Sequence, residues 1–357
     1  MPIPELDTPA LVVDVDRLET NLARMAGRAE AAGIDLTPHA KTHKCVPLAR
    51  RQLAHGARGL TVATLDEAEL FADGGCDRLF IAYPCWAGGD RAARLRALHE
   101  RVELRVGVDS VAGADQLAAA IRGADHSLTV LIEVDCGGRR SGVTPDQIRD
   151  LVTHCLRIGL DVAGAFCHPG HAYTSPGQVP GAAADERAAL TTAGAVLTWL
   201  LDRPPVLSGG STPTALDGLA HPLTEVRPGT YVFGDRQQMH LAAVPEDEIA
   251  LVVATRVVSV PRAGEAVLDA GSKALSSDRP AWLTGHGWIA EAPEATVAAL
   301  TEEHAVVRGL RRPPAVGDLV RVVPNHVCTA VNLGREITVV SDGKIVDMWP
   351  VGPGARR

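Results

Sequence analysis

The chain has 357 residues, of which 46% are hydrophobic and 22% charged, so it suits a folded protein with two domains and substantial cores. A net charge of −8 without basic clusters argues against nucleic acid and anionic membrane surfaces as partners. No uncharged apolar run reaches the roughly 18 residues of a membrane span, and the opening segment MPIPELDTPALVVDVD lacks the regions of a signal peptide. Seven scattered cysteines without a CxxC pair predict no disulfide framework. We therefore expect a cytoplasmic protein.

Short apolar segments alternate with amphipathic ones as far as about residue 240. Eight of the apolar segments are predicted strands: 33–38, 59–65, 78–83, 104–109, 128–135, 161–168, 205–210 and 230–233. The segments between them repeat apolar residues at i, i+3, i+4 and i+7, which is typical of helices with one buried face. Eight such units predict a closed (β/α)8 barrel over residues 15–240, although periodicity alone also allows a doubly wound open sheet.

The pattern changes after residue 240, where strand-like segments are joined by Gly, Pro and Asp turns. Examples are IALVVATRVVSV, EAVLDAG, HAVVRGL, DLVRVVP and EITVVSDGKIVDMW. The Asp342-Gly343 pair between two β-branched runs predicts a hairpin. We expect residues 241–357 to form an all-β domain, which residues 1–14 join as a further strand.

Residues that follow the strands of such a barrel share one pocket at the carboxyl end of the sheet. The polar groups predicted there are amine, imidazole, phenol, guanidinium, carboxylate and a Gly-Ser-Thr loop. They belong to His39, Lys41, His43, Thr64, Asp66, Tyr83, Asp109, Asp135, Arg139, Arg140, His168, His171, Tyr173, residues 208–212, Gly234 and Asp235. A pocket this polar predicts a polar ligand.

The loop SGGSTPT at residues 208–214 is a candidate phosphate site, although such loops are also common turns. Its glycines let backbone N–H groups approach an anion, and Ser211 and Thr212 add hydroxyl donors. The chain has neither GxxxxGK(S/T) nor a convincing GxGxxG after its first strand, which argues against ATP and a Rossmann-bound dinucleotide. Lys41 at the barrel mouth, with a separate phosphate loop, favours pyridoxal phosphate, whose aldehyde forms a Schiff base with lysine.

Several motifs resemble those of the D-threonine aldolase and D-serine dehydratase family, pyridoxal phosphate enzymes with the alanine-racemase-like fold. They are PHAKTHK (38–44), RRSGV (139–143), HPGHAY (168–173), SGGSTPT (208–214), RPGTYVFGD (227–235), DAGSKALSSD (269–278) and PNHVC (324–328), in order over nearly the whole chain. The resemblance implies a fold-type III barrel with a C-terminal β domain, and we expect a homodimer.

The resemblance also implies roles for individual residues. It makes Lys41, rather than Lys44 or Lys273, the lysine that binds the cofactor. It places Arg140 near the cofactor ring and a group of loop and aromatic residues around the rest of the cofactor: Gly210, Ser211, Thr212, Tyr173 and Tyr231.

The segment PNHVC carries a candidate metal site. His326 and Cys328 stand at i and i+2 of an expected extended segment, so their side chains would share one face. Spacing alone favours a buried cysteine beside a hydrogen-bonded histidine, but the resemblance implies a metal-binding position. Imidazole and thiolate suit zinc, whereas manganese and magnesium prefer oxygen ligands. In this family the aldolases often carry His and Asp here and the dehydratases His and Cys, so both reaction and metal stay open.

The resemblance implies a D-β-hydroxy-α-amino acid as the small-molecule substrate, with the metal on its β-hydroxyl group. Removal of the hydroxyl proton would cleave D-threonine to glycine and acetaldehyde, whereas removal of the Cα proton would release water and then ammonia and a keto acid. His171 or His168 is the candidate base for cleavage, and either could equally hold a loop. We expect the aldolase reaction because His171 supplies a second imidazole, with D-serine dehydratase as the alternative.

Two further functions are less favoured. A non-catalytic pyridoxal phosphate carrier would resemble the barrel alone, so the β domain and the HxC pair count against it. Racemisation by a tyrosine of the second domain is not expected, because residues 240–357 contain no tyrosine.

Overall fold

The computed structural model describes residues 3–312 and 314–352, which divide into two compact units. The barrel unit comprises residues 25–41 and 48–229. The β unit comprises residues 3–24, 42–47, 230–312 and 314–352. The predicted domain boundaries at residues 14 and 240 stay a prediction. They differ from the division into compact units, in which residues 15–24, 42–47 and 230–240 cluster with the β unit.

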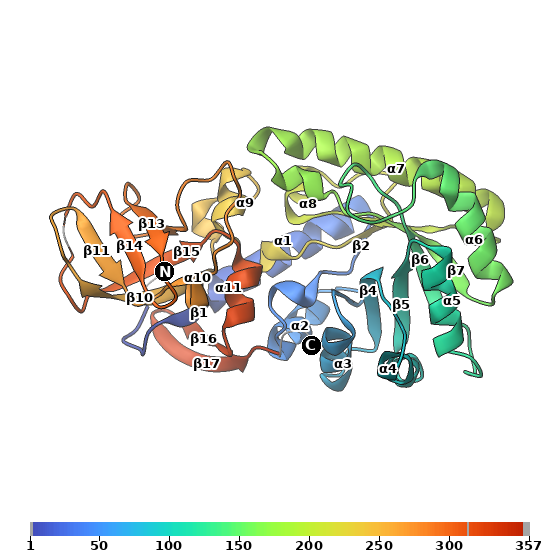
Figure 1. Cartoon of the computed structure of the whole chain (residues 1–357), viewed down its shortest axis with the longest axis horizontal. Coiled ribbons are helices and arrows are strands. Elements are labelled where there is room, and N and C mark those ends of the chain that lie inside the picture. The colour runs from blue at the N-terminus through green and yellow to red at the C-terminus, as the bar shows by residue number, and fades with distance from the viewer. Residues whose placement is uncertain (1–2, 313, 353–357) are drawn as a thin grey trace. The chain divides into compact units, whose positions relative to one another are not determined.

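The barrel unit contains eight parallel strands in the order β2-β9-β8-β7-β6-β5-β4-β3 (Figure 1). The sheet closes beyond its two edge strands, where His39 bridges Thr61 and the Thr61 N–H donates to the Pro38 carbonyl at 2.9 Å. This closure confirms the expected barrel rather than an open sheet. The strands are β2 (Asp35–Leu36), β3 (Leu60–Val62), β4 (Arg78–Pro84), β5 (Glu103–Val108), β6 (Thr129–Glu133), β7 (Asp161–Phe166), β8 (Val206–Gly209) and β9 (Glu225–Val226).

Helices follow most of these strands and lie outside them in Figure 1. Side-chain caps start several of them; for example, Thr64 accepts the Glu67 N–H at 3.1 Å, and Ser110 accepts the Gly113 N–H at 3.2 Å. Thr64, which was predicted to face the pocket, therefore fixes a helix start. The helices are α1 (Val15–Ala32), α2 (Val46–Ala54), α3 (Leu65–Asp73), α4 (Asp90–His99), α5 (Val111–Ala120), α6 (Ile148–Arg157), α7 (Val179–Leu200) and α8 (Thr212–Asp217).

The last predicted barrel strand was placed wrongly. Residues 230–233 contain the short 3-10 helix η5 (Thr230–Val232), and the eighth strand is β9. Pro228 and Gly229 separate β9 from this apolar segment and interrupt the strand. Burial explains the misleading pattern, because Tyr231 and Phe233 are enclosed although they are not in a sheet.

The β unit contains nine strands, in the order β13-β14-β11-β10-β1-β16-β17 with β15 paired to β10 and β12 to β15. Strand β1 pairs antiparallel with β10 and parallel with β16. Positive φ values at Asp342 (47°) and Gly343 (72°) form the predicted hairpin turn. The strands are β1 (Ala10–Asp14), β10 (Leu251–Ser259), β11 (Glu265–Leu268), β12 (Gly287–Ile289), β13 (Thr296–Leu300), β14 (Ala305–Arg308), β15 (Leu319–Pro324), β16 (Glu336–Ser341) and β17 (Lys344–Pro350).

Three short helices complete the described part of the β unit: α9 (Arg236–His240), α10 (Ser272–Leu275) and α11 (Val327–Leu333). All seven cysteines are free thiols. Over the described residues, every helix is too short or too polar to cross a membrane.

Aromatic rings fill part of the barrel interior. The Phe80 and Phe166 rings meet edge to face with centroids 5.1 Å apart, and both side chains are buried. Gly107 makes room for this pair, because a Cβ at that position would lie 2.7 Å from the Phe166 ring. Small residues inside the barrel therefore decide where its large side chains lie.

We predict that Gly164→Ala destabilises the barrel. Gly164 in β7 pairs with Val206 in β8, and its added Cβ would lie 1.9 Å from the Val206 carbonyl oxygen. We expect the free energy of unfolding in urea to fall by about 3 kcal/mol or more. As a control, Gly181→Ala in α7 meets no heavy atom within 4 Å, and we expect it to add about 0.5 to 1 kcal/mol. Equal stability of the two variants would contradict this packing.

Candidate active site

Lys41 lies directly after β2 in the 3-10 helix η1 (Ala40–Thr42) of the barrel unit. The preceding segment is anchored on both sides, since the His39 N–H donates to the Pro228 carbonyl at 3.0 Å and His39 bridges Thr61. The side chain of Lys41 is partly buried. The lysine thus extends from a fixed strand end, the arrangement that covalent binding of a cofactor needs.

His168 follows β7 and is close enough to Lys41 to respond to its charge. Burial and the positive charges of Lys41, Arg227 and Arg140 hold the pKa of His168 well below its usual range. The imidazole is therefore neutral at neutral pH. The structure thus brings together Lys41, Arg140, His168 and His171, four of the predicted site residues.

His171 is oriented by a carboxylate. Its Nε2 lies 3.2 Å from Oδ2 of Asp185 on α7, and its buried Nδ1 has no hydrogen-bond partner among the described residues. A neutral ring that donates from Nε2 keeps a lone pair on Nδ1, which can accept a proton. The ring of Tyr173 lies 6.4 Å from that of His168, centroid to centroid. His171 therefore has the hydrogen-bonded support that a general base requires.

Arg140 stands beyond β6 on a turn with several internal hydrogen bonds. The Asp135 carboxylate accepts the N–H groups of Gly137 and Arg139 at 2.9 and 3.0 Å. The Arg140 guanidinium is largely exposed, and its Nη2 lies 3.8 Å from the buried Glu133 carboxylate. Arg140 is thus an exposed cation on a hydrogen-bonded turn, accessible to an anionic ligand.

Arg227 is a buried cation for which the sequence motifs predicted no role. Its Nη2 donates to the Cys167 carbonyl at 2.5 Å and its Nε to the Ser208 hydroxyl at 2.8 Å. The guanidinium also lies 5.3 Å from the Phe166 ring centroid. The sequence feature that could have pointed to Arg227 is its position just before the Pro-Gly pair at a strand end, within RPGTYVFGD.

The loop SGGST offers fewer backbone N–H donors to a phosphate group than the sequence predicted. The Gly210 N–H donates to Glu186 Oε1 at 2.6 Å, and the Ser211 N–H donates to Thr214 Oγ1 at 2.9 Å. These two backbone donors are therefore used inside the protein. Gly210 has φ 80°, and a Cβ there would lie 2.3 Å from Val226 Cγ2, so the close approach of the chain requires glycine. Thr212 begins α8 just beyond this turn.

His326 and Cys328 lie at the junction of β15 and α11, not in an extended segment, so that part of the prediction is wrong. His326 is the N-cap residue of α11 and Cys328 lies in its first turn. The two side chains still interact, because Cys328 is hydrogen-bonded to His326. Cys328 Sγ also lies 3.2 Å from Oγ1 of Thr42, which belongs to the same unit and follows Lys41 in the sequence. A strand-to-helix turn, rather than strand alternation, brings the pair together.

The donor set around His326 suits a metal cation. Its Nδ1 lies 2.7 Å from Oδ2 of Asp278, which leaves Nε2 as the ligating atom. Desolvation lowers the pKa of His326, but Cys328 and Asp278 outweigh it and raise this pKa to about 11. Such an environment favours positive charge. No cluster of three or more His, Cys, Asp or Glu ligands occurs in residues 3–312 and 314–352, so this pair offers two donors, fewer than the three protein ligands that catalytic zinc usually has.

Asp235 holds the ligand-bearing turn. This buried carboxylate accepts the Gln238 N–H at 2.8 Å and the Val327 N–H at 3.0 Å. It therefore ties α9 to the first residue of α11, between His326 and Cys328. Asp235 was predicted to face the pocket; its observed contacts are with backbone instead.

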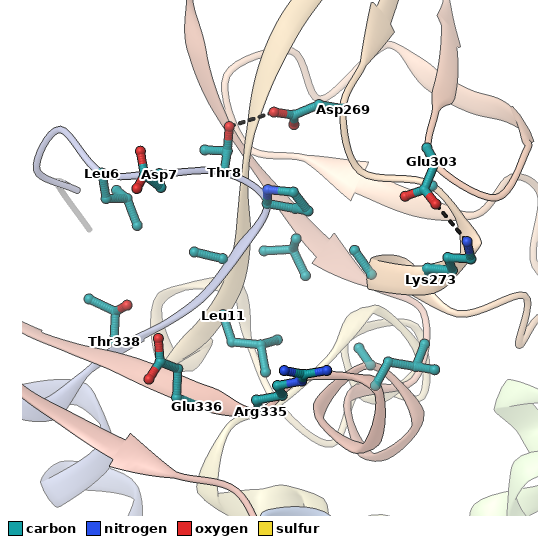
Figure 2. Close-up of a pocket in the computed structure, with 18 of the residues that line it drawn as sticks. Leu6, Asp7, Thr8, Leu11, Asp269, Lys273, Glu303, Arg335, Glu336 and Thr338 are labelled. Atoms are coloured by element: carbon teal, nitrogen blue, oxygen red, sulfur yellow. Dashed lines mark hydrogen bonds and ion pairs between the residues drawn. The ribbon is translucent and has the colours of Figure 1, made fainter.

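The alternative lysines are engaged elsewhere in the β unit. Lys44 is buried and bonds to Asn332. Lys273 is exposed on α10 and pairs with Glu302 and Glu303, at 2.8 and 2.6 Å, which raises its pKa. Figure 2 shows its bond to Glu303 at the edge of a cavity of 690 Å³. A protonated, paired amine is a poor nucleophile, which argues against Lys273.

Tyr231, the other aromatic candidate for cofactor binding, is buried in the β unit.

Comparison with known proteins identifies the two parts of the chain. Residues 13–237 match the alanine racemase N-terminal domain, and residues 250–340 match the putative serine dehydratase domain. The chain is 35% identical to a D-threo-3-hydroxyaspartate dehydratase of Delftia sp. (strain HT23), over 95% of this chain and 96% of that one. It is 31% identical to a D-threonine aldolase of Arthrobacter sp., over 98% and 93% of the two chains.

Solved structures agree with these relatives. The D-threo-3-hydroxyaspartate dehydratase from Delftia sp. HT23 superposes with a TM-score of 0.91 at 32% identity, covering 98% of each chain. A D-threonine aldolase from Filomicrobium marinum gives 0.90 at 30% identity, covering 99% of this chain and 97% of that one. The resemblance inferred from the motifs and the expected fold class are thereby confirmed, and the names of these relatives agree with the expected class of enzyme. The chain belongs to the alanine racemase N-terminal domain family, among the members that carry a serine dehydratase domain after the barrel.

Proposed function

We propose that the protein is a lyase that requires pyridoxal phosphate and a divalent metal and removes water from D-β-hydroxy-α-amino acids. The observation that carries this proposal is the His326–Cys328 pair, oriented by Asp278 in the dehydratase domain. An imidazole and a thiolate with open positions beside them can hold a metal that binds the β-hydroxyl group of a substrate. The dehydratase named among the relatives supports the same reaction.

Lys41 is the proposed cofactor lysine and the proposed base at Cα. Pyridoxal phosphate, when bound, supplies an electron sink for the charge that develops at Cα. His168, whose pKa is held well below its usual range by burial and by the charge of Lys41, lies within electrostatic reach of this amine. Arg140 and Arg227 keep positive charge near the site, which favours binding of an anionic cofactor and a substrate carboxylate.

Elimination needs assistance at the departing hydroxyl group. A divalent metal, when bound, supplies the Lewis acidity that makes the β-hydroxyl group a better leaving group. The chain contributes His326 Nε2 and Cys328 Sγ as donors, and this nitrogen–sulfur set favours zinc over manganese or magnesium. Asp278 fixes the tautomer of His326 through Nδ1. One relative's solved structure is described as a metal-free form, which fits a family of metal-binding proteins.

Aldol cleavage is the second candidate, and the sequence had placed it first. The observation in its favour is His171, whose Nδ1 lone pair is left available by the contact between Nε2 and Asp185. A base at that position could take the β-hydroxyl proton instead of the Cα proton. The D-threonine aldolases among the relatives support this reading. The His326–Cys328 pair of the β unit argues against a non-catalytic pyridoxal phosphate carrier. The expected homodimer stays a prediction.

We predict that Lys41→Ala abolishes the absorbance of covalently bound cofactor together with all turnover, because the residue supplies the only proposed amine for attachment. Borohydride reduction of the wild-type protein followed by peptide mapping should place the pyridoxyl label on Lys41. Lys44→Ala and Lys273→Ala serve as controls, since the amines of both residues bind other side chains. A label on either control lysine would overturn the assignment.

We predict that Asp278→Asn weakens metal binding about 10- to 100-fold, since it removes the carboxylate that orients the ligand His326. Competition with a chromogenic chelator would measure the affinity. Chelation of the wild-type protein should stop turnover but leave the cofactor absorbance, and zinc should restore activity at least as well as manganese. Asp318→Asn is the control, because this carboxylate accepts a backbone N–H elsewhere in the β unit. Full activity after chelation would refute the metal site.

We predict that D-threo-3-hydroxyaspartate, D-serine or D-threonine yields ammonia and a keto acid, with the L isomers inert. Coupled assays for ammonia and for glycine separate elimination from cleavage. His171→Asn should then leave ammonia release within about 10-fold of wild type, because elimination does not need a base at the β-hydroxyl group. Glycine and an aldehyde as products, with a loss of about 100-fold in His171→Asn, would instead establish aldol cleavage.

A further inference from the structure

Glu186 is a buried carboxylate directed at the loop that carries the proposed phosphate site. It lies on α7 with 2% of its surface exposed, and its Oε1 accepts the Gly210 N–H at 2.6 Å. The same oxygen lies so close to Gly209 that a Cβ there would be 2.5 Å away. Glu186 thus fits against the backbone of two successive glycines at the end of β8.

A carboxylate in this position is costly, so its contacts matter. Burial raises the pKa of Glu186 to about 7, against the opposing effects of the Gly210 N–H and the positive charges of Arg227 and Arg187. The Cys167 thiol, 3.9 Å away, is the remaining polar neighbour and a weak donor. Among the residues that the structure describes, the backbone bond from Gly210 is therefore its one short hydrogen bond, and the loop and the carboxylate depend on each other.

The loop is held from its other side as well. Val226 in β9 lies where a side chain of Gly210 would be, and the Arg227 N–H donates to the Gly209 carbonyl at 2.9 Å. Ser211 and Thr214 then close a capping box at the start of α8. Contacts of Glu186, Val226 and Arg227 thus hold the backbone on both sides of Gly210, directly before Ser211 and Thr212.

We propose that Glu186 is a positioning residue for cofactor binding, which fixes the phosphate loop through Gly210 without touching the phosphate itself. The inference rests on the proposed function, because it takes pyridoxal phosphate as the cofactor and residues 210–212 as the phosphate site that the sequence predicts. Its specific consequence is that Glu186 contributes to the recognition of the phosphate group and not to that of the pyridine ring or the aldehyde.

The test compares pyridoxal phosphate with pyridoxal, which lacks the phosphate, in titrations of the cofactor-free full-length protein followed by absorbance. We expect Glu186→Ala to weaken pyridoxal phosphate binding at least about 10-fold and pyridoxal binding less than about 3-fold, as the loss of one hydrogen bond to a charged group implies. Glu186→Gln keeps an acceptor oxygen and should stay within about 3-fold of wild type for both ligands. Glu186→Asp, whose carboxylate cannot reach Gly210, replaces Glu186→Ala if that variant does not fold.

Glu67 provides a matched control in another strand–helix unit. It is also a buried carboxylate, and it accepts the Ala63 N–H at 2.8 Å. Glu67→Ala should lower the melting temperature but leave the preference for pyridoxal phosphate over pyridoxal unchanged. The proposal is overturned if Glu186→Ala weakens both ligands by the same factor or neither. Equal affinity of the wild-type protein for both ligands would show instead that the predicted phosphate site at residues 210–212 is wrong, and the role of Glu186 with it.

Discussion

The Arg227 guanidinium is the interaction on which the barrel mouth depends. It donates to the Cys167 carbonyl and to the Ser208 hydroxyl, and Ser208 in turn donates to Glu225 at 2.6 Å. Glu225 also pairs with Arg105 at 2.5 Å, so a continuous polar chain crosses the interior from β5 to the end of β7. Buried charges are tolerated only when each is paired and hydrogen-bonded, so loss of one member would leave the others unsatisfied. This requirement fixes four strands, β5, β7, β8 and β9, relative to one another.

The β unit uses the same principle on a smaller scale. Asp235 is buried, and its two oxygens accept N–H groups from Gln238 and Val327. Val327 lies 92 positions from Asp235 in the sequence. Burial raises the pKa of Asp235, while these hydrogen bonds and the charge of His326 lower it. A buried charge in each unit thus fixes a turn whose side chains carry out the proposed chemistry, and rigid support of this kind is what precise catalytic geometry requires.

Local patterns in the sequence predicted most of the strands and the hairpin at Asp342, because periodicity and turn chemistry act over a few neighbouring residues. They missed β13 and misplaced the eighth barrel strand, where burial without pairing imitates a strand at Tyr231. The motifs identified the family and predicted Lys41 as the cofactor lysine. They could not show Glu186, whose contact with Gly210 spans 24 positions and arises only when the barrel closes. Long-range hydrogen bonds of single polar residues leave no periodic signal.

The choice between elimination and cleavage reduces to which proton is removed first, and the two candidate bases differ in what surrounds them. Lys41 stands near His168, whose pKa is held well below its usual range by burial and by the charges of Lys41, Arg227 and Arg140. His171 has the carboxylate of Asp185 at Nε2, which orients the ring with Nδ1 available. Lys41 is the candidate base for the Cα proton, and His171 is the candidate base for the β-hydroxyl proton. If the metal assists departure of the hydroxyl group, removal of the Cα proton suffices, and His171 is left free to position the substrate.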